Sequence, residues 1–455
     1  MPDEPNLEPW IELGQLAEAA SPQALVEFVE NLSASDAALA LSRLSDEQRT
    51  RVLTALPAEE AADLLNQLPD VQAVGLIEQL SPQAASAILD ELPSNEQADR
   101  IGDLSPTVAE AFLRRMDPAE AADARLLSRY ADDVAGGLMV TEFLRYKENL
   151  TVGEVVADMR ARADDYRDYD VQYACVCDAR GRLTGVLRLR DLLLAPPAKP
   201  IVELMIRRPL SVRDDEPLDE VADFFETHDF FGVPVVDADG RLLGVVRQSA
   251  VAEAWGDRQD SDFLKTQGIV GGEEIRSMPI ARRSSRRLAW LSVNILLNVI
   301  AASVIAAYQD TLATVIALAV FLPIISDMSG CSGNQAVAVS MRELSLGLVR
   351  PHELLRVWLK EVSVGLINGV VLGVLIGAVA LAWQGNATLG LVVGTALCLN
   401  TIVAVSIGGV VPLVLKRLGM DPAIAAGPIL TTVTDMCGFF FVLGIATLFL
   451  KQLTS

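Results

Sequence analysis

Two carboxylates lie inside long apolar stretches of the C-terminal half, where a charge needs either a partner or a function. Asp435 closes the segment Thr431-Thr-Val-Thr-Asp, and Asp327 lies within the segment 323–335, PIISDMSGCSGNQ. A charged side chain at bilayer depth costs about 2.5–3.5 kcal/mol on insertion scales. Because no Lys or Arg is near Asp435 in the sequence to neutralise it, we interpret Asp435 as a functional residue.

Oxygen donors accompany these two acids. The Thr431 hydroxyl, the Asn334 amide and backbone carbonyls such as that of Gly330 are hard ligands. Magnesium prefers octahedral oxygen and keeps several of its waters, so one or two carboxylates suit it. Neither a thiolate nor an imidazole cluster is available for a softer metal. The sequence therefore predicts a divalent-cation site formed by Asp435, Asp327, Thr431, Asn334 and Gly330.

Five apolar runs must position these residues, and each long run meets the roughly 20-residue length that crosses a bilayer. The runs are about 288–308, from 312 onward, 358–383, 389–415 and 422–450. We expect the second run to be interrupted at Ser326-Asp327, because its middle is polar and glycine-rich and irregular backbone at that depth survives where it lines a cavity. In the third run, Gly365, Gly369, Gly373 and Gly377 recur every fourth residue and predict a close helix contact.

Basic residues set the expected orientation. Arg282, Arg283, Arg286 and Arg287 precede the first run, four Lys or Arg lie between the second and third, and Lys416 and Arg417 lie between the fourth and fifth. The loops on the other side carry none. The positive-inside rule then places the N-terminus in the cytosol and the C-terminus outside, in a plasma or inner membrane.

Charge divides the chain near Ala281. Residues 281–455 carry 11 Lys/Arg and 7 Asp/Glu, a net charge of +4, whereas residues 1–280 carry 26 and 53, a net charge of −27. Such an acidic half repels nucleic acid and attracts cations. It begins with no signal peptide, so we expect it in the cytosol. No nucleophile–base pair, phosphate-binding loop or metal-hydrolase motif is present, so an enzyme is not predicted.

The acidic half begins with a repeat. Leu32, Leu44, Leu56, Leu68, Leu80, Leu92, Leu104 and Met116 are spaced by 12 residues, and most are followed by Ser or Pro. Ser or Pro followed by Glu or Gln is typical of a helix start. Each repeat is therefore predicted to be one short helix with a tight turn, and a helix this short must stack on its neighbours to bury its apolar face.

A duplication follows the repeat. The segment 176–191, VCDARGRLTGVLRLRD, recurs 59 residues later as 235–250, VVDADGRLLGVVRQSA. Each copy predicts a strand, an Asp-x-x-Gly turn, a strand and a helix. The pair resembles tandem CBS domains, which commonly bind adenine nucleotides or act as dimerising regulatory modules. The resemblance suggests an ATP site near Tyr173, Arg190, Asp191 and Phe230, where an acid at the Asp191 position contacts a ribose; the alternative is a purely structural scaffold.

The whole chain resembles the MgtE family of magnesium channels and transporters. The likeness rests on segments 136–139, 187–191, 230–236, 333–335, 360–366, 417–422 and 435–438. It implies a homodimer in membrane lipid, with a pore on the two-fold axis where Asp435 binds hydrated Mg²⁺. It also implies cytosolic Mg²⁺ sites among acidic residues, and Asp219, Asp229, Glu253, Asp262 and Asp421 fall on positions of that kind.

The predicted fold is therefore multidomain. An all-α helical-repeat domain occupies 1–135, α/β tandem CBS domains 136–255, a connector helix 256–287, and a five-helix transmembrane domain 288–455. The predicted function is a magnesium-selective, magnesium-gated channel for divalent cation import. A coupled Mg²⁺ transporter, a Mn²⁺ or Co²⁺ transporter and a non-transporting CBS membrane sensor are the alternatives.

Overall fold

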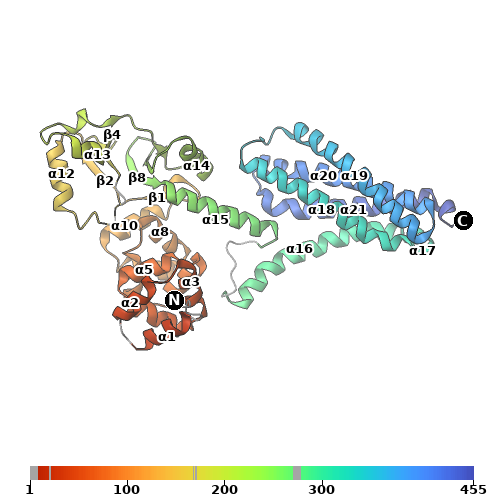
Figure 1. Ribbon diagram of the computed structural model, residues 1–455, viewed down its shortest axis with the longest axis horizontal. Coiled ribbons are helices and arrows are strands. Elements are labelled where there is room, and N and C mark those ends of the chain that lie inside the picture. Colours follow the sequence, from red (N-terminus) through yellow and green to blue (C-terminus); the bar gives the residue numbers. More distant parts are fainter. Residues whose placement is uncertain (1–8, 20–21, 168, 170–171, 270–277, 455) are drawn as a thin grey trace, which may run out of the picture. The chain divides into compact units, whose positions relative to one another are not determined.

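The computed structural model describes residues 9–19, 22–167, 169, 172–269 and 278–454 (Figure 1). The described residues form two compact units. One contains the chain up to Gln259 together with Met278, and the other contains the chain from Asp260 to the C-terminus. They are called here the cytosolic unit and the membrane unit.

The 12-residue repeat builds a helical solenoid, as predicted. Its helices are α1 (Pro9–Glu18), α2 (Pro22–Glu30), α3 (Ala34–Arg43), α4 (Asp46–Ala55), α5 (Ala58–Asn66), α6 (Asp70–Ile77), α7 (Pro82–Leu89), α8 (Ser94–Asp103), α9 (Pro106–Leu113) and α10 (Pro118–Leu127). From α3 to α10 each helix starts 12 residues after the previous one. The repeat leucines from Leu44 to Leu104 are buried, and each helix from α4 to α8 packs against the helix two further along.

The helix starts are marked by local signals: side-chain caps begin α3, α4, α7 and α10, and α5, α6 and α8 begin directly after a proline. Ser45 forms a capping box with Gln48, and the Ser81 hydroxyl accepts a hydrogen bond from the backbone N–H of Ala84. Such caps satisfy N–H groups that have no partner within the helix. Because the start of each helix is encoded locally, the spacing of the sequence repeat is preserved in the fold.

Two four-stranded sheets form the CBS pair. The short helix α11 (Ala135–Leu138) precedes them. The first sheet has the order β2 (Leu144–Lys147), β3 (Tyr173–Cys177), β4 (Leu183–Arg188), β5 (Ile206–Arg207), and the second has β1 (Met139–Val140), β8 (Leu242–Arg247), β7 (Gly232–Val236), β6 (Val212–Arg213). The helices are α12 (Val152–Ala161), α13 (Leu189–Leu194), the 3-10 helix η1 (Ile201–Glu203) and α14 (Leu218–Thr227). Strand β1 precedes the first copy yet completes the sheet of the second.

The two predicted Asp-x-x-Gly turns meet. Gly181 and Gly240 both have φ near +80°, as the turns require. The N–H of Leu183 donates to the carbonyl of Gly240 at 3.0 Å, and the N–H of Leu242 donates to the carbonyl of Gly181 at 3.1 Å. This reciprocal pairing joins the two copies around a local pseudo-two-fold.

Helix α15 (Gln248–Thr266) leaves the second CBS copy, with its residues up to Gln259 in the cytosolic unit and its last two turns in the membrane unit. The membrane unit continues with α16 (Ile280–Ala307), α17 (Gln309–Thr314), α18 (Leu318–Ser345), α19 (Leu354–Gln384), α20 (Ala387–Arg417), α21 (Pro422–Leu448) and α22 (Leu450–Thr454). Helix α20 is central, because α18, α19 and α21 all pack on it. Residues 270–277 of the predicted connector lie outside the described residues.

Among the described residues, four helices are long and apolar enough to cross a membrane, namely α16, α19, α20 and α21, the last from Ala426. Helix α18 is not one of them, although it is 28 residues long. The predicted interruption at Ser326-Asp327 is wrong, because α18 is one continuous helix that also contains Pro323. The serines and glycines remain helical because a helix satisfies its backbone hydrogen bonds within the same segment, which a bilayer requires.

The glycine ladder of α19 faces α20 and makes the predicted close contact. A Cβ on Gly369 would lie 2.8 Å from the carbonyl oxygen of Cys398, and one on Gly377 would lie 2.9 Å from that of Gly390. The two helix backbones therefore meet along several turns, with no room for even a methyl group between them.

Candidate functional site

Asp435 lies midway along α21 in the membrane unit and is only 9 % exposed. The hydroxyl of Ser326 on α18 donates a hydrogen bond to its Oδ1. Thr434 beside it is fully buried. The carboxylate is therefore held at the contact between α18 and α21, the two helices on which the sequence places every predicted pore residue.

Helix α18 has two faces of different chemistry. One face packs on the bundle through Ile325, Ser329, Gly333 and Ala336, all buried. The other presents Asp327, Gly330 and Asn334, which recur three and four residues apart, with Asp327 and Asn334 exposed in the single chain. On α21, Thr431 is exposed one turn before Asp435, and its hydroxyl donates to the carbonyl of Gly427 at 3.0 Å.

The predicted pore residues are thus only partly brought together. The Asp435 carboxylate accepts a hydrogen bond from Ser326, which precedes Asp327 in α18. Thr431 lies one turn before Asp435 on α21. Within the stretches of chain that the structure describes, no three His, Cys, Asp or Glu side chains form a group that could hold a metal ion. A single chain therefore supplies separate carboxylates and hydroxyls along these two helices.

A buried amide of α20 lies against α21 one turn after Asp435. Asn400 of α20 is fully buried and, in the described structure, neither its side-chain oxygen nor its nitrogen has a hydrogen-bond partner. A Cβ on Gly438 of α21 would lie 2.7 Å from the Asn400 Nδ2 atom. Gly438 therefore makes room for the amide, and the two residues fix how closely α20 and α21 approach beside Asp435.

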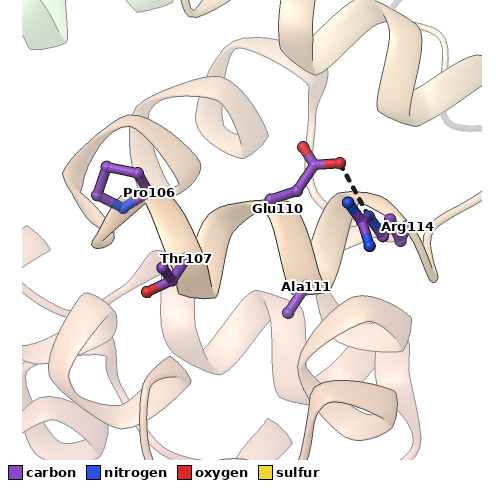
Figure 2. A pocket seen from close by; sticks show the side chains of 5 residues that line it. All are labelled: Pro106, Thr107, Glu110, Ala111 and Arg114. Atoms are coloured by element: carbon purple, nitrogen blue, oxygen red, sulfur yellow. Dashed lines mark hydrogen bonds and ion pairs between the residues drawn. The ribbon is translucent and has the colours of Figure 1, made fainter.

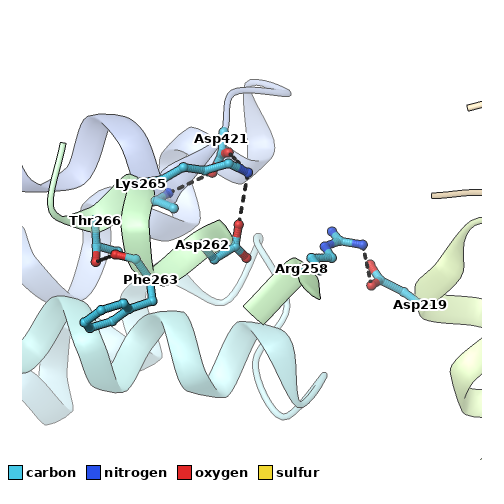
Figure 3. Close-up of polar contacts among 8 residues, drawn as sticks. Asp219, Arg258, Asp262, Phe263, Lys265, Thr266 and Asp421 are labelled. Carbon is cyan, nitrogen blue, oxygen red and sulfur yellow. Dashed lines mark hydrogen bonds and ion pairs between the residues drawn. The ribbon is translucent and has the colours of Figure 1, made fainter. Parts of the chain in front are cut away.

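Three predicted regulatory carboxylates lie in ion pairs with basic side chains of α15. In the cytosolic unit, the Arg258 guanidinium donates from Nη1 to Asp219 Oδ1 at 3.0 Å. In the membrane unit, Lys265 Nζ lies 3.1 Å from Asp262 Oδ1 and 3.2 Å from Asp421 Oδ2 (Figure 3). Lys265 therefore brings together two of the residues that the sequence predicted as ligands.

The ammonium group of Lys265 is partly shielded from water. Partial burial pushes its pKa down, but the hydrogen bonds to Asp262 and Asp421 and their charges outweigh that effect, so the pKa is raised above its usual value. Lys265 therefore keeps its positive charge between the two carboxylates at neutral pH.

The other two predicted regulatory residues, Asp229 and Glu253, are exposed in the cytosolic unit. Glu253 on α15 acts electrostatically on Glu96 of α8, whose pKa is raised mainly by burial. Beside Glu96, burial and the carboxylates of Asp132 and Glu96 raise the pKa of Asp99 to about 8. Carboxylates thus gather where α8 lies near α15, although the sequence analysis identified only Glu253 among them.

One arginine partly neutralises these carboxylates. The Arg100 side chain is 5 % exposed, forms an ion pair with Asp70, and lies 3.4 Å from Glu96. Because its guanidinium has no acceptor and always carries charge, Arg100 can be buried only beside such acids.

The predicted nucleotide residues fall in separate places. Tyr173 is at the start of β3 and packs between the two copies, beside Val186 and Leu242. Asp191 of α13 accepts a hydrogen bond from Arg188 at 2.7 Å and lies 3.6 Å from Arg190. Phe230 belongs to the second copy, where its ring stacks on that of His228. Among the described contacts, none joins Phe230 to Asp191.

A shallow hollow on α9 is lined by Pro106, Thr107, Glu110, Ala111 and Arg114 (Figure 2). Its two charged groups bind one another, with Arg114 Nε 3.0 Å from Glu110 Oε1. We assign no function to this surface.

Comparison with known families agrees with this layout. The MgtE divalent cation transporter family matches residues 322–445, the MgtE intracellular N domain matches 32–133, and the CBS domain matches 133–197 and 201–257. The chain thus combines the parts of this transporter family, with an N domain and a CBS pair ahead of its membrane helices.

Similar proteins identify the family. The magnesium transporter MgtE of Thermus thermophilus is 35 % identical over 337 residues, 73 % of this chain and 74 % of that protein. MgtE of Bacillus subtilis is 33 % identical over 336 residues, 74 % of each chain. The crystal structure of the cytosolic domain of the Mg²⁺ channel MgtE in complex with ATP is 34 % identical, covering 54 % of this chain and 99 % of that one, with a TM-score of 0.49. The two transporters show by their sequence identity and coverage that the chain belongs to the MgtE magnesium transporter family.

Several residues of the site were missed in the sequence. These are Arg258, which binds Asp219, Lys265, which binds Asp421, and Asn400, which lies against Gly438 one turn after Asp435. Each comes from a segment far away in the sequence from the residue that it contacts. Lys265 offered one signal, since it follows Asp262 by three residues in a helix. Asn400 offered another, as a lone amide in an apolar run.

Proposed function

We propose that this protein is a magnesium-selective channel that admits Mg²⁺ and closes when its cytosolic unit binds Mg²⁺. The observation that carries the proposal is Asp435, a carboxylate buried midway along a helix of the membrane unit and held by Ser326. An acid at that depth marks an ion pathway by default.

Selectivity for magnesium follows from the donor chemistry. The residues Asp327, Gly330 and Asn334 on α18 and Thr431 on α21 offer carboxylate, carbonyl, amide and hydroxyl oxygen. A hydrated Mg²⁺ ion needs few direct ligands and keeps its waters, whereas Ca²⁺ needs six to eight oxygens. Membership of the MgtE family supports the same ion.

Two copies of the chain complete the pathway in this proposal. One chain leaves the polar face of α18 exposed beside Asp435, and a polar face at membrane depth requires either a protein neighbour or a water-filled cavity. A homodimer with the two faces opposed would supply two Asp435 carboxylates to one axis. We also propose five spans, with α18 as the second, an N-terminus in the cytosol and a C-terminus outside.

Gating follows from the charge of the cytosolic half. Residues 1–280 carry a net charge of −27, so two such halves repel one another when no divalent cation is bound. Magnesium would bridge carboxylates such as Asp219, Asp229, Glu253, Asp262 and Asp421 and draw the domains together. ATP at the CBS pair, near Tyr173, Arg190, Asp191 and Phe230, would adjust the same equilibrium.

The test measures magnesium flux into proteoliposomes that contain the wild-type protein, Asp435→Asn or Asp310→Asn. Asp310 is an exposed carboxylate of α17, so the control makes the same chemical change away from the proposed pathway. We expect flux in the wild type and in Asp310→Asn but none in Asp435→Asn, and we expect internal Mg²⁺ to stop the wild-type flux.

Three results would favour another function. Flux that follows a proton or sodium gradient indicates a coupled transporter, and preferential Mn²⁺ or Co²⁺ flux indicates a transporter for those ions. Absence of flux in the wild type would favour a non-transporting membrane sensor, whereas equal flux in the wild type and Asp435→Asn would make Asp435 structural.

A further inference from the structure

The last turn of α15 is fixed to the membrane unit at two points. Lys265 binds Asp421, which precedes α21, and Gly268 just after the helix lies against the Trp290 indole of α16. Gly268 has φ +78° and is buried, and a Cβ there would collide with the indole ring. The position of Lys265 is therefore set by packing as well as by charge.

Asp421 is itself rigidly placed. One of its oxygens, Oδ1, accepts a hydrogen bond of 2.9 Å from the N–H of Ala423 and caps α21. Its other oxygen, Oδ2, is the one that meets Lys265. A capping carboxylate has little freedom to turn away, so a cation placed between Asp262 and Asp421 finds one of its two ligands already oriented.

The carboxylates of Asp262 and Asp421 carry two negative charges, and the Lys265 ammonium group between them supplies one positive charge (Figure 3). An ammonium group donates to both carboxylates and neutralises half of their charge. A divalent cation would neutralise all of it and would have to displace the ammonium group to reach the same oxygens. Lys265 and a divalent cation are therefore alternatives at this position.

We propose that Lys265 is a built-in competitor for divalent cations at the Asp262–Asp421 pair and holds the end of α15 to α21 when none is bound. This inference rests on the proposed function only in taking the pair as a regulatory site. It predicts a contact that exists without magnesium and a site that takes magnesium more weakly than a lysine-free site would.

Hydrogen exchange of residues 260–269 in the full-length protein in lipid nanodiscs tests both statements. The samples are the wild type, Lys265→Gln, Lys265→Arg and the control Lys147→Gln, an exposed lysine of the cytosolic unit. Each is measured first with a chelator and then in a Mg²⁺ titration. Lys265→Gln keeps a polar side chain without the charge, and Lys265→Arg keeps the charge.

With chelator, the segment should exchange about three- to fivefold faster in Lys265→Gln than in the wild type, the ratio expected for losing one partly exposed ion pair. Lys265→Arg and Lys147→Gln should match the wild type. During the titration, Mg²⁺ should restore protection in Lys265→Gln at a concentration about three- to fivefold below the wild-type midpoint, since the same ion pair is no longer displaced.

Asp421→Asn separates the two roles of the site. It should lose protection in chelator, as Lys265→Gln does, but Mg²⁺ should not restore it. Equal exchange of the wild type and Lys265→Gln in chelator would overturn the metal-free contact, and an unchanged or higher midpoint would overturn the competition. Both readouts are independent of ion flux, so a protein that fails to conduct Mg²⁺ would refute the proposed channel without deciding this result.

Discussion

The paired glycines of α19 and α20 allow a quantitative prediction. A Cβ on Gly373 would lie 2.6 Å from the carbonyl oxygen of Gly394, and a Cβ on Gly394 would lie 2.5 Å from that of Gly373. Ordinary van der Waals contact begins near 3.4 Å. Either Gly→Ala change must therefore move the two helix backbones apart by roughly 0.8 Å, which a closely packed interface cannot absorb without loss.

Overpacking of this kind costs about 1–3 kcal/mol. We expect Gly373→Ala and Gly394→Ala each to lower the free energy of unfolding by that amount. Because one separation of the helices relieves both collisions, the double variant should cost clearly less than the two single changes added together. Gly444→Ala in α21, where the new Cβ would meet the Tyr308 hydroxyl oxygen at an ordinary contact distance of 3.7 Å, should be neutral or slightly stabilising.

The assay is unfolding of the full-length protein in mixed micelles by sodium dodecyl sulfate. Tryptophan fluorescence reports the transition, because Trp358 and Trp383 both lie on α19. If Gly373→Ala and Gly394→Ala unfold at the same detergent concentration as Gly444→Ala, or if the double variant is strictly additive, the close backbone contact is not what holds α19 to α20.

Two further predictions concern Asp99 and Gly438. In the folded state the pKa of Asp99 is raised to about 8, whereas in the unfolded chain it is near 3.8. Between these pH values the folded state holds a proton that the unfolded chain has lost. The stability of α8 should therefore fall as the pH rises through this range, by at most about 1.4 kcal/mol per pH unit. Asp99→Asn should remove the share of this dependence that Asp99 contributes and leave the share of Glu96, whose pKa is also raised by burial. Hydrogen exchange of α8, corrected for intrinsic exchange, measures the change, and an unchanged pH profile would refute the raised pKa of Asp99. Gly438→Ala should lower Mg²⁺ flux and the free energy of unfolding, because the new methyl group would push α21 away from Asn400. Adding Asn400→Ala to Gly438→Ala should restore both quantities, because it shortens the side chain that the methyl group meets. A double variant no better than Gly438→Ala would show that this collision is not the cause.

The architecture could be predicted because its signals are local or periodic. The 12-residue leucine spacing, with Ser or Pro after most of the leucines, indicated the solenoid, since a buried Leu or Met followed by Ser, Pro or Asp precedes each helix from α4 to α10. The two Asp-x-x-Gly turns indicated the CBS strands for the same reason. The glycine ladder indicated a close contact, although only the structure identifies α20 as the helix that it faces.

The failures come from long-range contacts and from membrane chemistry. Ser326-Asp327 was predicted as an interruption because polarity suggested irregular backbone, yet α18 is continuous and its exposed polar residues lie on one face. The ion pairs that Arg258 and Lys265 form with Asp219 and Asp421 depend on partners far away in the sequence. A carboxylate that is a good metal ligand is equally a good partner for a lysine or an arginine, and spacing alone does not decide between them.

The stacking pattern of the N-terminal helices limits how the solenoid can change in length. Because each helix from α4 to α8 packs on the helix two further along, the even- and odd-numbered helices from α4 to α10 form two columns. Deleting one repeat would transfer every later helix to the opposite column and reverse the side from which the chain reaches the CBS sheets. Deleting two would keep the columns and the exit side. Natural variation in this region should therefore add or remove repeats in pairs.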